Sequence, residues 1–385
     1  MSEADQRFMA QALRLAHRGL YTTDPNPRVG CVIVKDAEVV GAGWHQQAGG
    51  PHAEIHALQQ VGEAGAEQTR GATAYVTLEP CSHHGRTGPC AEVLIAAGIR
   101  RVVVAMPDPN PEVAGQGLER LRQAGVEVET GIGQAEAEAL NAGFISRMLR
   151  GRPLLRCKLA MSLDGRTAMA TGESRWITSA AARQDVQRLR ARSSAILTGI
   201  GTVLADDPAL TVRAAAGEIT PLDDGQLRQP LRIVVDTQGR LPARSRLLQS
   251  PGPVLLATSA DIAQVLDMQQ FSSSSLSLLA VPLLKDGHQG QQRLDLTALL
   301  QALAAYELNE VLVEAGATLS GALLSAGLVD ELVIYMAPKL MGNAARGLFD
   351  LPWLSNMAQC VDVDISDIRA VGRDIRITAR IAAAN

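Results

Sequence analysis

The sequence is poor in aromatic residues, in net charge and in long apolar stretches, and each shortage excludes a class of protein. Aromatic side chains make up 3% of its 385 residues, whereas it contains 35 glycines, a balance that favours tight turns and an α/β layout. A formal net charge of −4 gives the chain no bulk attraction to nucleic acid. No apolar run reaches the roughly 18 residues needed to cross a bilayer, so a membrane-spanning protein is not expected.

Cysteine is also scarce, with five residues, an odd number that does not suit a framework of disulfides. The opening residues MSEADQRFMAQALRLAHRGL contain acids and have the pattern of an amphipathic helix rather than of a signal peptide. We therefore expect reduced thiols and a cytoplasmic location. Cys31, Cys157 and Cys360 are expected to be small buried apolar residues, the usual fate of an isolated cysteine.

The chain is too long for one ordinary core, and its pattern changes near 148–153, where the basic segment MLRGRP precedes a new apolar stretch. We expect one domain over 1–147 and a second over 148–385. In the first, the predicted order β-β-α-β-α-β-α-β describes a sheet covered by helices. It begins with a hairpin of strands at 28–35 and 38–44.

Strands and helices also alternate in the second domain. Helices are predicted at 180–191, near 295–304 and at 317–326, between strands that begin at 154 and end near 381. The serine-rich segment at 271–279 and the polar segment at 286–293 are predicted to be loops.

Two short segments of the first domain gather residues that bind transition metals. His52-Ala53-Glu54 begins a predicted helix, and Pro80-Cys81 and Pro89-Cys90 follow, the second cysteine opening another helix. One imidazole and two thiolates suit tetrahedral zinc and leave a fourth position for water. Zinc lowers the pKa of such a water to about 7, and Glu54 is well placed to take its proton and pass it to a leaving amine. The pattern is typical of zinc-dependent nucleobase deaminases.

A structural zinc site is the alternative, and it would need a fourth protein ligand such as His83 or His84. The two cysteines are separated by eight residues, not by two, and the polar insert SHHGRTGP is expected to overhang the site. That spacing, with TDPNPRVGCV at 23–32 and MPDPNPEVAGQG at 106–117, resembles the deaminase half of the bifunctional riboflavin-biosynthesis deaminase–reductases.

This resemblance covers about the first 145 residues and implies a cytidine-deaminase-like α/β/α fold. It implies hydrolysis of the 2-amino group of a diaminopyrimidinone ribosylamino 5′-phosphate. It also implies one Zn²⁺ per chain, and Asn26 as a residue that holds the ring. The implied metal ligands are His52, Cys81 and Cys90, with Glu54 as the catalytic residue. Weaker candidates for ribose or phosphate contacts are His45, His83 and Arg86.

The second domain has no G-x-G-x-x-G signature of a dinucleotide-binding fold, and TGIG at 198–201 is a partial match. The segment VEAGATLSGALLSAGLVDEL at 313–332 describes a strand, a glycine turn and the start of a helix. Backbone N–H groups at 316–320 can therefore receive a phosphate. Arg190 and Arg213 have no obvious acid nearby in sequence and are candidates for binding an anionic substrate.

With KLAMSLDGRTA at 158–168, GESRWITS at 172–179 and TGIGTVLADDPALTVR at 198–213, this segment resembles the reductase half of the same family. The resemblance implies a dihydrofolate-reductase-like α/β fold and hydride transfer from NADPH to the ribosyl C1′, which opens the sugar to a ribityl chain. The implied NADPH site is lined by Ala160, Trp176, Thr202, Asp206, Gly316, Ala317, Thr318, Leu319, Ser320, Gly321 and Ala322. The implied substrate site is lined by Ser174, Arg190, Leu210, Arg213 and Glu314. Candidates for the proton donor are Lys158 and Asp164.

Three other functions fit parts of the sequence. A deaminase that acts on a flipped tRNA base would share the zinc motif, but the acidic charge, the cysteine spacing and the second domain oppose it. Glu54 beside His52 opposes a zinc module without activity, and the intact motifs oppose loss of either activity. We expect a bifunctional enzyme that acts on a small phosphorylated pyrimidine, without nucleic-acid or membrane partners, and that forms a homo-oligomer.

Overall fold

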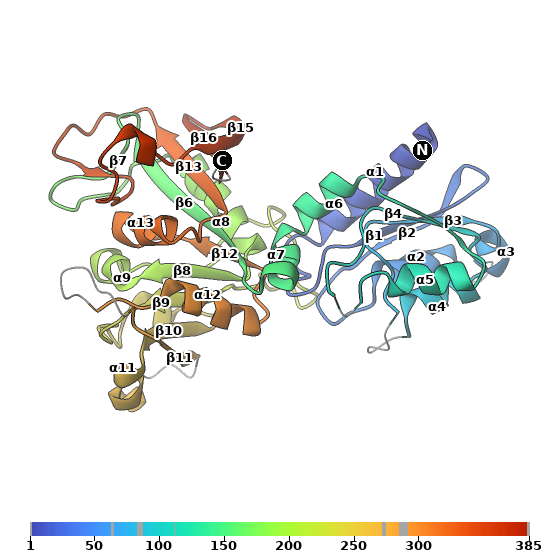
Figure 1. Cartoon of the computed structure of the whole chain (residues 1–385), viewed down its shortest axis with the longest axis horizontal. Helices are drawn as coiled ribbons and strands as arrows, with labels where there is room; N and C mark the ends of the chain where they lie inside the picture. Colours follow the sequence, from blue (N-terminus) through green and yellow to red (C-terminus); the bar gives the residue numbers. More distant parts are fainter. Residues whose placement is uncertain are drawn as a thin grey trace. The chain divides into compact units, whose positions relative to one another are not determined.

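The chain divides into two compact units, each described here by itself (Figure 1). Unit 1 comprises Met1–Gly151 and Thr220–Gln226, and unit 2 comprises Arg152–Ile219 and Leu227–Asn385. The computed structural model describes residues 2–62, 65–82, 88–111, 113–271, 275–284 and 292–382. Both units are built of helices on a mixed sheet, so the predicted α/β class is confirmed.

Unit 1 contains a five-stranded sheet in the order β2-β1-β3-β4-β5. The β1–β2 and β1–β3 pairs are antiparallel, and β3, β4 and β5 are parallel. Its strands are β1 (Gly30–Lys35), β2 (Glu38–Trp44), β3 (Thr73–Val76), β4 (Arg101–Val104) and β5 (Glu127–Thr130). Its helices are α1 (Glu3–Arg18), α2 (Ala53–Val61), α3 (Gly65–Thr69), α4 (Cys90–Ala96), α5 (Gln116–Gln123), α6 (Gln134–Leu140) and α7 (Ala142–Arg150).

The first hairpin is confirmed, and its turn has the geometry that right-handed strand twist requires. Asp36 and Ala37 have φ values of 51° and 65°, the left-handed pair of a two-residue hairpin turn. Strand β1, which precedes this turn, contributes side chains to two cores because successive side chains of a strand point to opposite faces. Cys31 and Ile33 pack under α2, α4 and α5, whereas Val32 and Val34 pack under α1 and α6 (Figure 1).

Unit 2 contains a nine-stranded sheet in the order β11-β10-β9-β8-β12-β6-β13-β16-β15. It is parallel from β11 to β13, and β13–β16 and β16–β15 are antiparallel. The strands are β6 (Leu154–Ser162), β8 (Ala195–Gly199), β9 (Leu231–Val235), β10 (Val254–Ser259), β11 (Leu276–Val281), β12 (Glu310–Val313), β13 (Glu331–Ala337), β15 (Val363–Val371) and β16 (Asp374–Ile381). A separate pair is formed by β7 (Arg166–Ala168) and β14 (Arg346–Gly347).

Helices cover both faces of this larger sheet (Figure 1). They are α8 (Ala180–Arg192), α9 (Ile200–Asp206), α10 (Arg246–Gln249), α11 (Ala260–Val265), α12 (Leu296–Ala305) and α13 (Ala317–Ser325), with 3-10 turns η1 (Met268–Gln270) and η3 (Met357–Gln359). The leucines of α12 and α13 share one core with β6, β8 and β12. On the other face, α8 packs near β13, and α9 and α10 pack on β9 and β10.

Two expectations are wrong. The segment at 271–279 is not a loop throughout, because β11 begins at Leu276 and runs parallel to β10. Its leucines pack at the sheet edge, and the preceding serines hid that pattern in the sequence. Cys360 is exposed, whereas Cys31 and Cys157 are buried as expected. Most of the second predicted loop, 286–293, lies outside the described residues.

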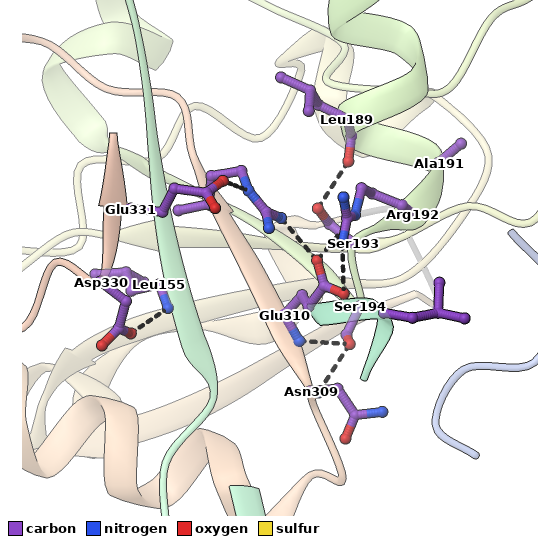
Figure 2. A network of polar contacts seen from close by, with 12 residues as sticks. Leu155, Leu189, Ala191, Arg192, Ser193, Ser194, Asn309, Glu310, Asp330 and Glu331 are labelled. Atoms are coloured by element: carbon purple, nitrogen blue, oxygen red, sulfur yellow. Dashed lines mark hydrogen bonds and ion pairs between the residues drawn. The ribbon is translucent and has the colours of Figure 1, made fainter. Parts of the chain in front are cut away.

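A buried ionic network fastens the amino ends of the central strands (Figure 2). The Glu310 side chain, 1% exposed, accepts hydrogen bonds from Arg156 Nη1 at 2.7 Å and from Arg192 Nε at 3.0 Å. Arg156 also pairs with Glu331 of β13. Ser194 Oγ accepts from the Glu310 backbone N–H at 3.1 Å. The network ties β6, β8, β12 and β13 at their amino ends, opposite the carboxyl edge where ligands bind in open α/β sheets.

We predict that Glu310→Ala destabilises unit 2 by about 3 kcal/mol, because it leaves buried Arg156 with Glu331 alone and removes the carboxylate that pairs with half-buried Arg192. The control is Arg188→Ala, which breaks an ion pair to Asp185 at 3.8 Å on a half-exposed side chain and should cost less than about 1 kcal/mol. Hydrogen exchange of the β6 and β12 amides, read by mass spectrometry, measures both effects. Equal protection in the two variants would contradict the importance given to the network.

Candidate functional site

Three predicted metal ligands come together in unit 1. His52 precedes α2 as its N-cap, Cys90 is the first residue of α4, and Cys81 follows the end of β3. His52 Nδ1 lies 3.6 Å from Cys81 Sγ and 3.3 Å from Cys90 Sγ, and the three donor atoms lie within 4.8 Å of one another. Tetrahedral zinc with bonds of about 2.0–2.3 Å places its ligand atoms about 3.5 Å apart. The donor set and its spacing therefore fit zinc.

The two thiols differ in their protonation. Cys90 donates to Cys81 and lowers its pKa to about 4, and burial opposes this effect. The backbone N–H of Cys90 also donates to Cys81 Sγ at 3.3 Å. The hydrogen bond between the two thiol groups, together with burial, raises the pKa of Cys90. The protein alone thus stabilises one thiolate and one thiol, whereas a divalent cation would hold both as thiolates.

Glu54 lies in the first turn of α2 and is buried, with 3% of its surface exposed. Burial raises the pKa of its carboxyl group, and the nearby His52 acts in the opposite direction. It also interacts with the Cys90 thiol. Among the residues that the structure places, neither lysine nor arginine pairs with it. A buried carboxyl group beside a metal centre, without a fixed cation, is suited to taking up and releasing a proton.

The predicted ring-binding residue Asn26 is oriented by His45. His45 Nδ1 lies 3.0 Å from the carbonyl oxygen of Pro51, and His45 Nε2 lies 3.0 Å from Asn26 Nδ2. A carbonyl oxygen only accepts, so Nδ1 carries the proton and Nε2 accepts from the amide of Asn26. Burial lowers the pKa of His45, which favours this neutral imidazole. Asn26 Oδ1 is therefore left to accept a hydrogen bond from a ligand.

Sequence analysis missed Glu79, which fixes the segment before Cys81. Its buried carboxylate accepts backbone N–H groups from Asp108 at 3.1 Å, Gly115 at 3.0 Å and Gly117 at 2.8 Å. Gly117 approaches so closely that a Cβ there would lie 1.9 Å from the Pro80 carbonyl oxygen. The only available signal was an acid at the end of an apolar strand, directly before Pro80-Cys81. The partners of Glu79 lie some 30 residues further on and cannot be recognised from spacing.

The predicted contacts of the cysteine insert lie outside the described residues. They concern His83, His84 and Arg86, so the alternative of a fourth protein ligand is not addressed by the described residues.

In unit 2, Arg190, Lys158 and Glu314 form a buried charged cluster. Arg190 Nε and Nη2 donate to the two Glu314 carboxylate oxygens at 2.6 and 3.0 Å, and Lys158 Nζ lies 3.9 Å from Oε2. Burial alone would raise the pKa of Glu314, but Arg190 and Lys158 lower it overall. Burial lowers the pKa of Lys158. The cluster sits where β12 ends, at the carboxyl edge of the sheet.

This pairing changes the interpretation of the two arginines. Arg190 directs its guanidinium to Glu314 and to the Thr211 carbonyl oxygen at 2.9 Å, so its acidic partner comes from a distant part of the sequence. The acid is 124 residues away in sequence. Arg213 has an exposed side chain, and its backbone N–H donates to Gln187. Leu210, four residues after the end of α9, is buried with a φ of 50°.

The predicted cofactor-binding residues belong to several chain segments. Gly316 caps α13 without a side-chain partner, so the first N–H groups of this helix are available to an anion. Gly199, before α9, lies close to α13, because a Cβ there would be 3.3 Å from Leu319 Cδ2. Helix α9, which carries Thr202 and Asp206, therefore begins close to the Gly316–Ala322 segment. The Ala160 carbonyl oxygen accepts from Thr167 Oγ1 at 3.1 Å.

Trp176 is 62% exposed, an unusual state for a tryptophan. Its carbonyl oxygen accepts from Lys339 Nζ at 2.5 Å, and the Arg183 guanidinium lies 4.3 Å from its ring centroid. Ser174, two residues earlier, is half-buried. The segment that carries Ser174 and Trp176 thus depends on residues of α8 and of the segment after β13 for its position.

Asp164 holds that segment after β13. Its carboxylate accepts backbone N–H groups from Met341 at 3.1 Å and Gly342 at 2.8 Å, and it also accepts from the Ser162 hydroxyl group. The Ser162 hydroxyl and these N–H groups lower the pKa of Asp164 to about 2. A carboxylate that is ionised and saturated with donors is a poor proton donor. Asp164 therefore anchors the segment with Lys339.

Comparisons with known proteins identify the family of the chain and of its two domains. A family described as the RibD C-terminal domain matches residues 153–377, and the cytidine and deoxycytidylate deaminase zinc-binding region matches residues 2–106. The riboflavin biosynthesis protein RibD of Escherichia coli is 54% identical over 374 residues, which are 96% of this chain and 98% of that protein. The chain belongs to the RibD family.

Solved structures extend this family relation to the whole fold. Acinetobacter baumannii RibD, form 1, has a TM-score of 0.88 and 46% identity, with 99% of each chain covered. A Thermotoga maritima protein has a TM-score of 0.83 and 31% identity over 98% of this chain and 99% of that one. Its title names a diaminohydroxyphosphoribosylaminopyrimidine deaminase / 5-amino-6-(5-phosphoribosylamino)uracil reductase.

Family membership makes this chain a bifunctional enzyme of riboflavin biosynthesis, with a zinc-binding deaminase domain and an NADPH-using reductase domain. The two predicted cofactors are thereby confirmed. Within the described residues, no helix has both the length and the hydropathy needed to cross a membrane.

We predict that Asp164→Asn raises the KM for NADPH about three- to tenfold with a smaller change in kcat. The amide places a donor against backbone donors, which loosens Lys339 and with it Trp176. Steady-state NADPH oxidation measures this effect, and ammonia release in the same preparation should stay unchanged. Asp295→Asn is the control, because Asp295 caps α12 and asparagine also caps helices. A changed kcat with an unchanged KM would contradict this positioning role.

Proposed function

We propose that the chain performs two consecutive steps, with the deaminase in residues 1–147 and the reductase in residues 148–385. The first step converts 2,5-diamino-6-ribosylamino-4(3H)-pyrimidinone 5′-phosphate to 5-amino-6-ribosylaminouracil 5′-phosphate, and the second reduces the ribosyl group to ribityl. The observation that carries this proposal is the cluster of His52, Cys81 and Cys90 beside buried Glu54. The Thermotoga relative, a diaminohydroxyphosphoribosylaminopyrimidine deaminase and uracil reductase, supports the choice of substrate.

For the first step, His52, Cys81 and Cys90 would hold the zinc ion. When bound, zinc makes water acidic enough to supply a nucleophile near neutral pH. Glu54 takes a proton from the attacking water and returns it to the 2-amino group, so a C–O bond forms at C2 while the C–N bond breaks and ammonia leaves. Asn26 accepts a hydrogen bond from the ring through Oδ1, because His45 occupies its Nδ2.

In the second step, NADPH supplies the hydride for C1′ when it is bound. The N-terminal N–H groups of α13 would receive a phosphate of the cofactor, and Ala160, Trp176, Thr202 and Asp206 would line its site. The geometry of Asp164 speaks against it as a proton donor. Lys158, which lies 3.9 Å from Glu314, therefore remains as the candidate source of the proton that completes the ring opening.

Substrate binding in unit 2 divides between the two arginines. Arg190 is already held by Glu314 and the Thr211 carbonyl group, so we assign it the orientation of Glu314. Arg213, with its exposed side chain, is the better match for the 5′-phosphate, because a guanidinium group pairs with phosphate in a bidentate manner. Ser174 and Leu210 complete the substrate site.

We also propose that the enzyme is a cytoplasmic homo-oligomer without a nucleic-acid partner. The net charge of −4 gives no general attraction to a polyanion. Cysteine ligands must stay reduced to hold zinc, which suits a reducing compartment.

A coupled assay on the purified chain tests the two-step function. Zinc per chain is counted, the diaminopyrimidinone ribosylamino phosphate is supplied with and without NADPH, and ammonia and NADPH are followed separately. We expect one zinc per chain, ammonia release without NADPH, and NADPH loss only after deamination. Zinc without ammonia release from this substrate would overturn the proposed substrate. NADPH loss that precedes ammonia release would overturn the proposed order.

A further inference from the structure

Residues 169–178, here called the strap, connect β7 to α8 and carry both Ser174 and Trp176. Among the residues that the structure describes, the backbone N–H groups of the strap that form hydrogen bonds do so within the strap itself. One example is the Met169 N–H, which donates to the Glu173 carbonyl oxygen at 2.8 Å. No strand or helix therefore fixes the strap through these N–H groups, and its position depends on contacts made by side chains.

Two basic side chains hold the carboxyl half of the strap. Lys339 Nζ donates to the Trp176 carbonyl oxygen at 2.5 Å, and Arg183 Nη1 donates to the Thr178 carbonyl oxygen at 2.7 Å. The Arg183 guanidinium group also lies 4.3 Å from the centroid of the Trp176 ring, a distance at which a cation is attracted to an indole. Trp176 is thus held from α8 and from the segment after β13.

Arg175, which belongs to the strap, makes a third contact with a different element. Its Nη2 group donates to the carbonyl oxygen of Asp206, the last residue of α9, and its Nε lies 3.6 Å from the Asp206 carboxylate. The last carbonyl groups of a helix have no partner within the helix, and a cation beside them is favourable. The two side chains are 54% and 37% exposed, so this contact is weak enough to break and form again.

These contacts fasten the strap on both sides of the central strands. Helix α9 directly follows β8, and Lys339 follows β13. In the sheet, β12 and β6 lie between β8 and β13, and all four strands are parallel. Their carboxyl ends therefore share one edge, where ligands bind in open α/β sheets. Ala160 near the end of β6 and Glu314 directly after β12 lie at this edge.

We propose that Arg175 is the clasp of the strap: by binding the end of α9, it keeps Trp176 against the cofactor site and slows the release of NADPH. The proposal rests on the proposed NADPH site, and it adds a positioning residue that acts through Trp176 and α9. Segments that close over a bound ligand often set its rate of release. Without the clasp, Lys339 and Arg183 still hold the strap, so it stays attached but leaves α9 more often.

The first measurement follows the strap without cofactor. The chain contains three tryptophans, so the W44F/W353F background leaves Trp176 as the only fluorescent indole. In this background, Arg175→Ala should lower the fluorescence anisotropy of Trp176 and increase its quenching by acrylamide, because the strap moves more freely. Arg175→Lys keeps a cation and one set of donors at the end of α9, and it should restore most of the parent anisotropy.

The second measurement follows the release of NADPH from the full-length, zinc-loaded chain. Energy transfer from Trp176 to bound NADPH is recorded by stopped flow after mixing with excess NADP⁺. Arg175→Ala should raise the dissociation rate constant and the KM for NADPH about two- to tenfold, the effect of losing one exposed ionic contact and one hydrogen bond. The kcat for NADPH oxidation should change much less than the KM, and ammonia release should stay unchanged.

Arg120→Ala is the matched control. It breaks an ion pair with Glu92 in unit 1, and these side chains are 50% and 41% exposed, close to the values for Arg175 and Asp206. This variant should leave both the Trp176 anisotropy and the release of NADPH at the parent values. Circular dichroism verifies that each variant is folded.

Two results would overturn the proposal. One is an Arg175→Ala variant whose Trp176 anisotropy and quenching equal those of the parent, which would show that Arg175 does not hold the strap. The other is a loosened strap that releases NADPH at the parent rate. Failure of the proposed cofactor site gives a different result, because the parent chain itself would then show no energy transfer from Trp176 to NADPH. That result would overturn the site and, with it, the effect of the clasp on release.

Discussion

A buried carboxylate needs a cation or several hydrogen-bond donors beside it, and this requirement determines which segments meet in both units. Glu79 collects backbone N–H groups and thereby fixes the turn before Cys81. Glu310 forms ion pairs with Arg156 and Arg192 and connects the amino ends of the central strands. Glu314 receives Arg190 and Lys158 at the carboxyl edge. Each glutamate draws together segments that are distant in sequence, and these segments carry the sites.

Glu54 differs from these three carboxylates. It is as deeply buried as Glu79, but the described residues give it no cation and no set of backbone donors comparable to that of Glu79. Its charged form is therefore costly until a metal ion and a substrate arrive. A group in this condition exchanges protons readily, whereas Arg190 and Lys158 outweigh the effect of burial and lower the pKa of Glu314, and Glu310 lies between two arginines. The contrast separates the carboxylate that reacts from those that position.

The parts of the protein predicted from sequence are those with local signals. His52 and Glu54 share the start of one helix, and the two Pro-Cys pairs stand at strand or helix ends, so their pattern was recognisable without a structure. The hairpin at Asp36 and Ala37 was recognisable for the same reason. The reductase residues came from resemblance to a family, because the second domain has no standard dinucleotide signature.

What could not be predicted depends on long-range pairing. Arg190 meets Glu314 across 124 residues, and Asp164 meets Gly342 across 178 residues. Neither partner can be recognised from its own neighbours. β11 was missed because serines surround its leucines, and parallel pairing with β10 outweighed that composition. Assignment of roles to individual site residues stays a prediction.

The most direct test of this account is ammonia release by Glu54→Gln, measured together with zinc content and with NADPH oxidation on the deaminated substrate. The account predicts a loss of ammonia release of about 100- to 10,000-fold, the usual contribution of proton transfer by a positioned group. Zinc content and NADPH oxidation should stay at the level of the parent chain. Ammonia release at the parent rate from the zinc-loaded variant would contradict the central role given to Glu54.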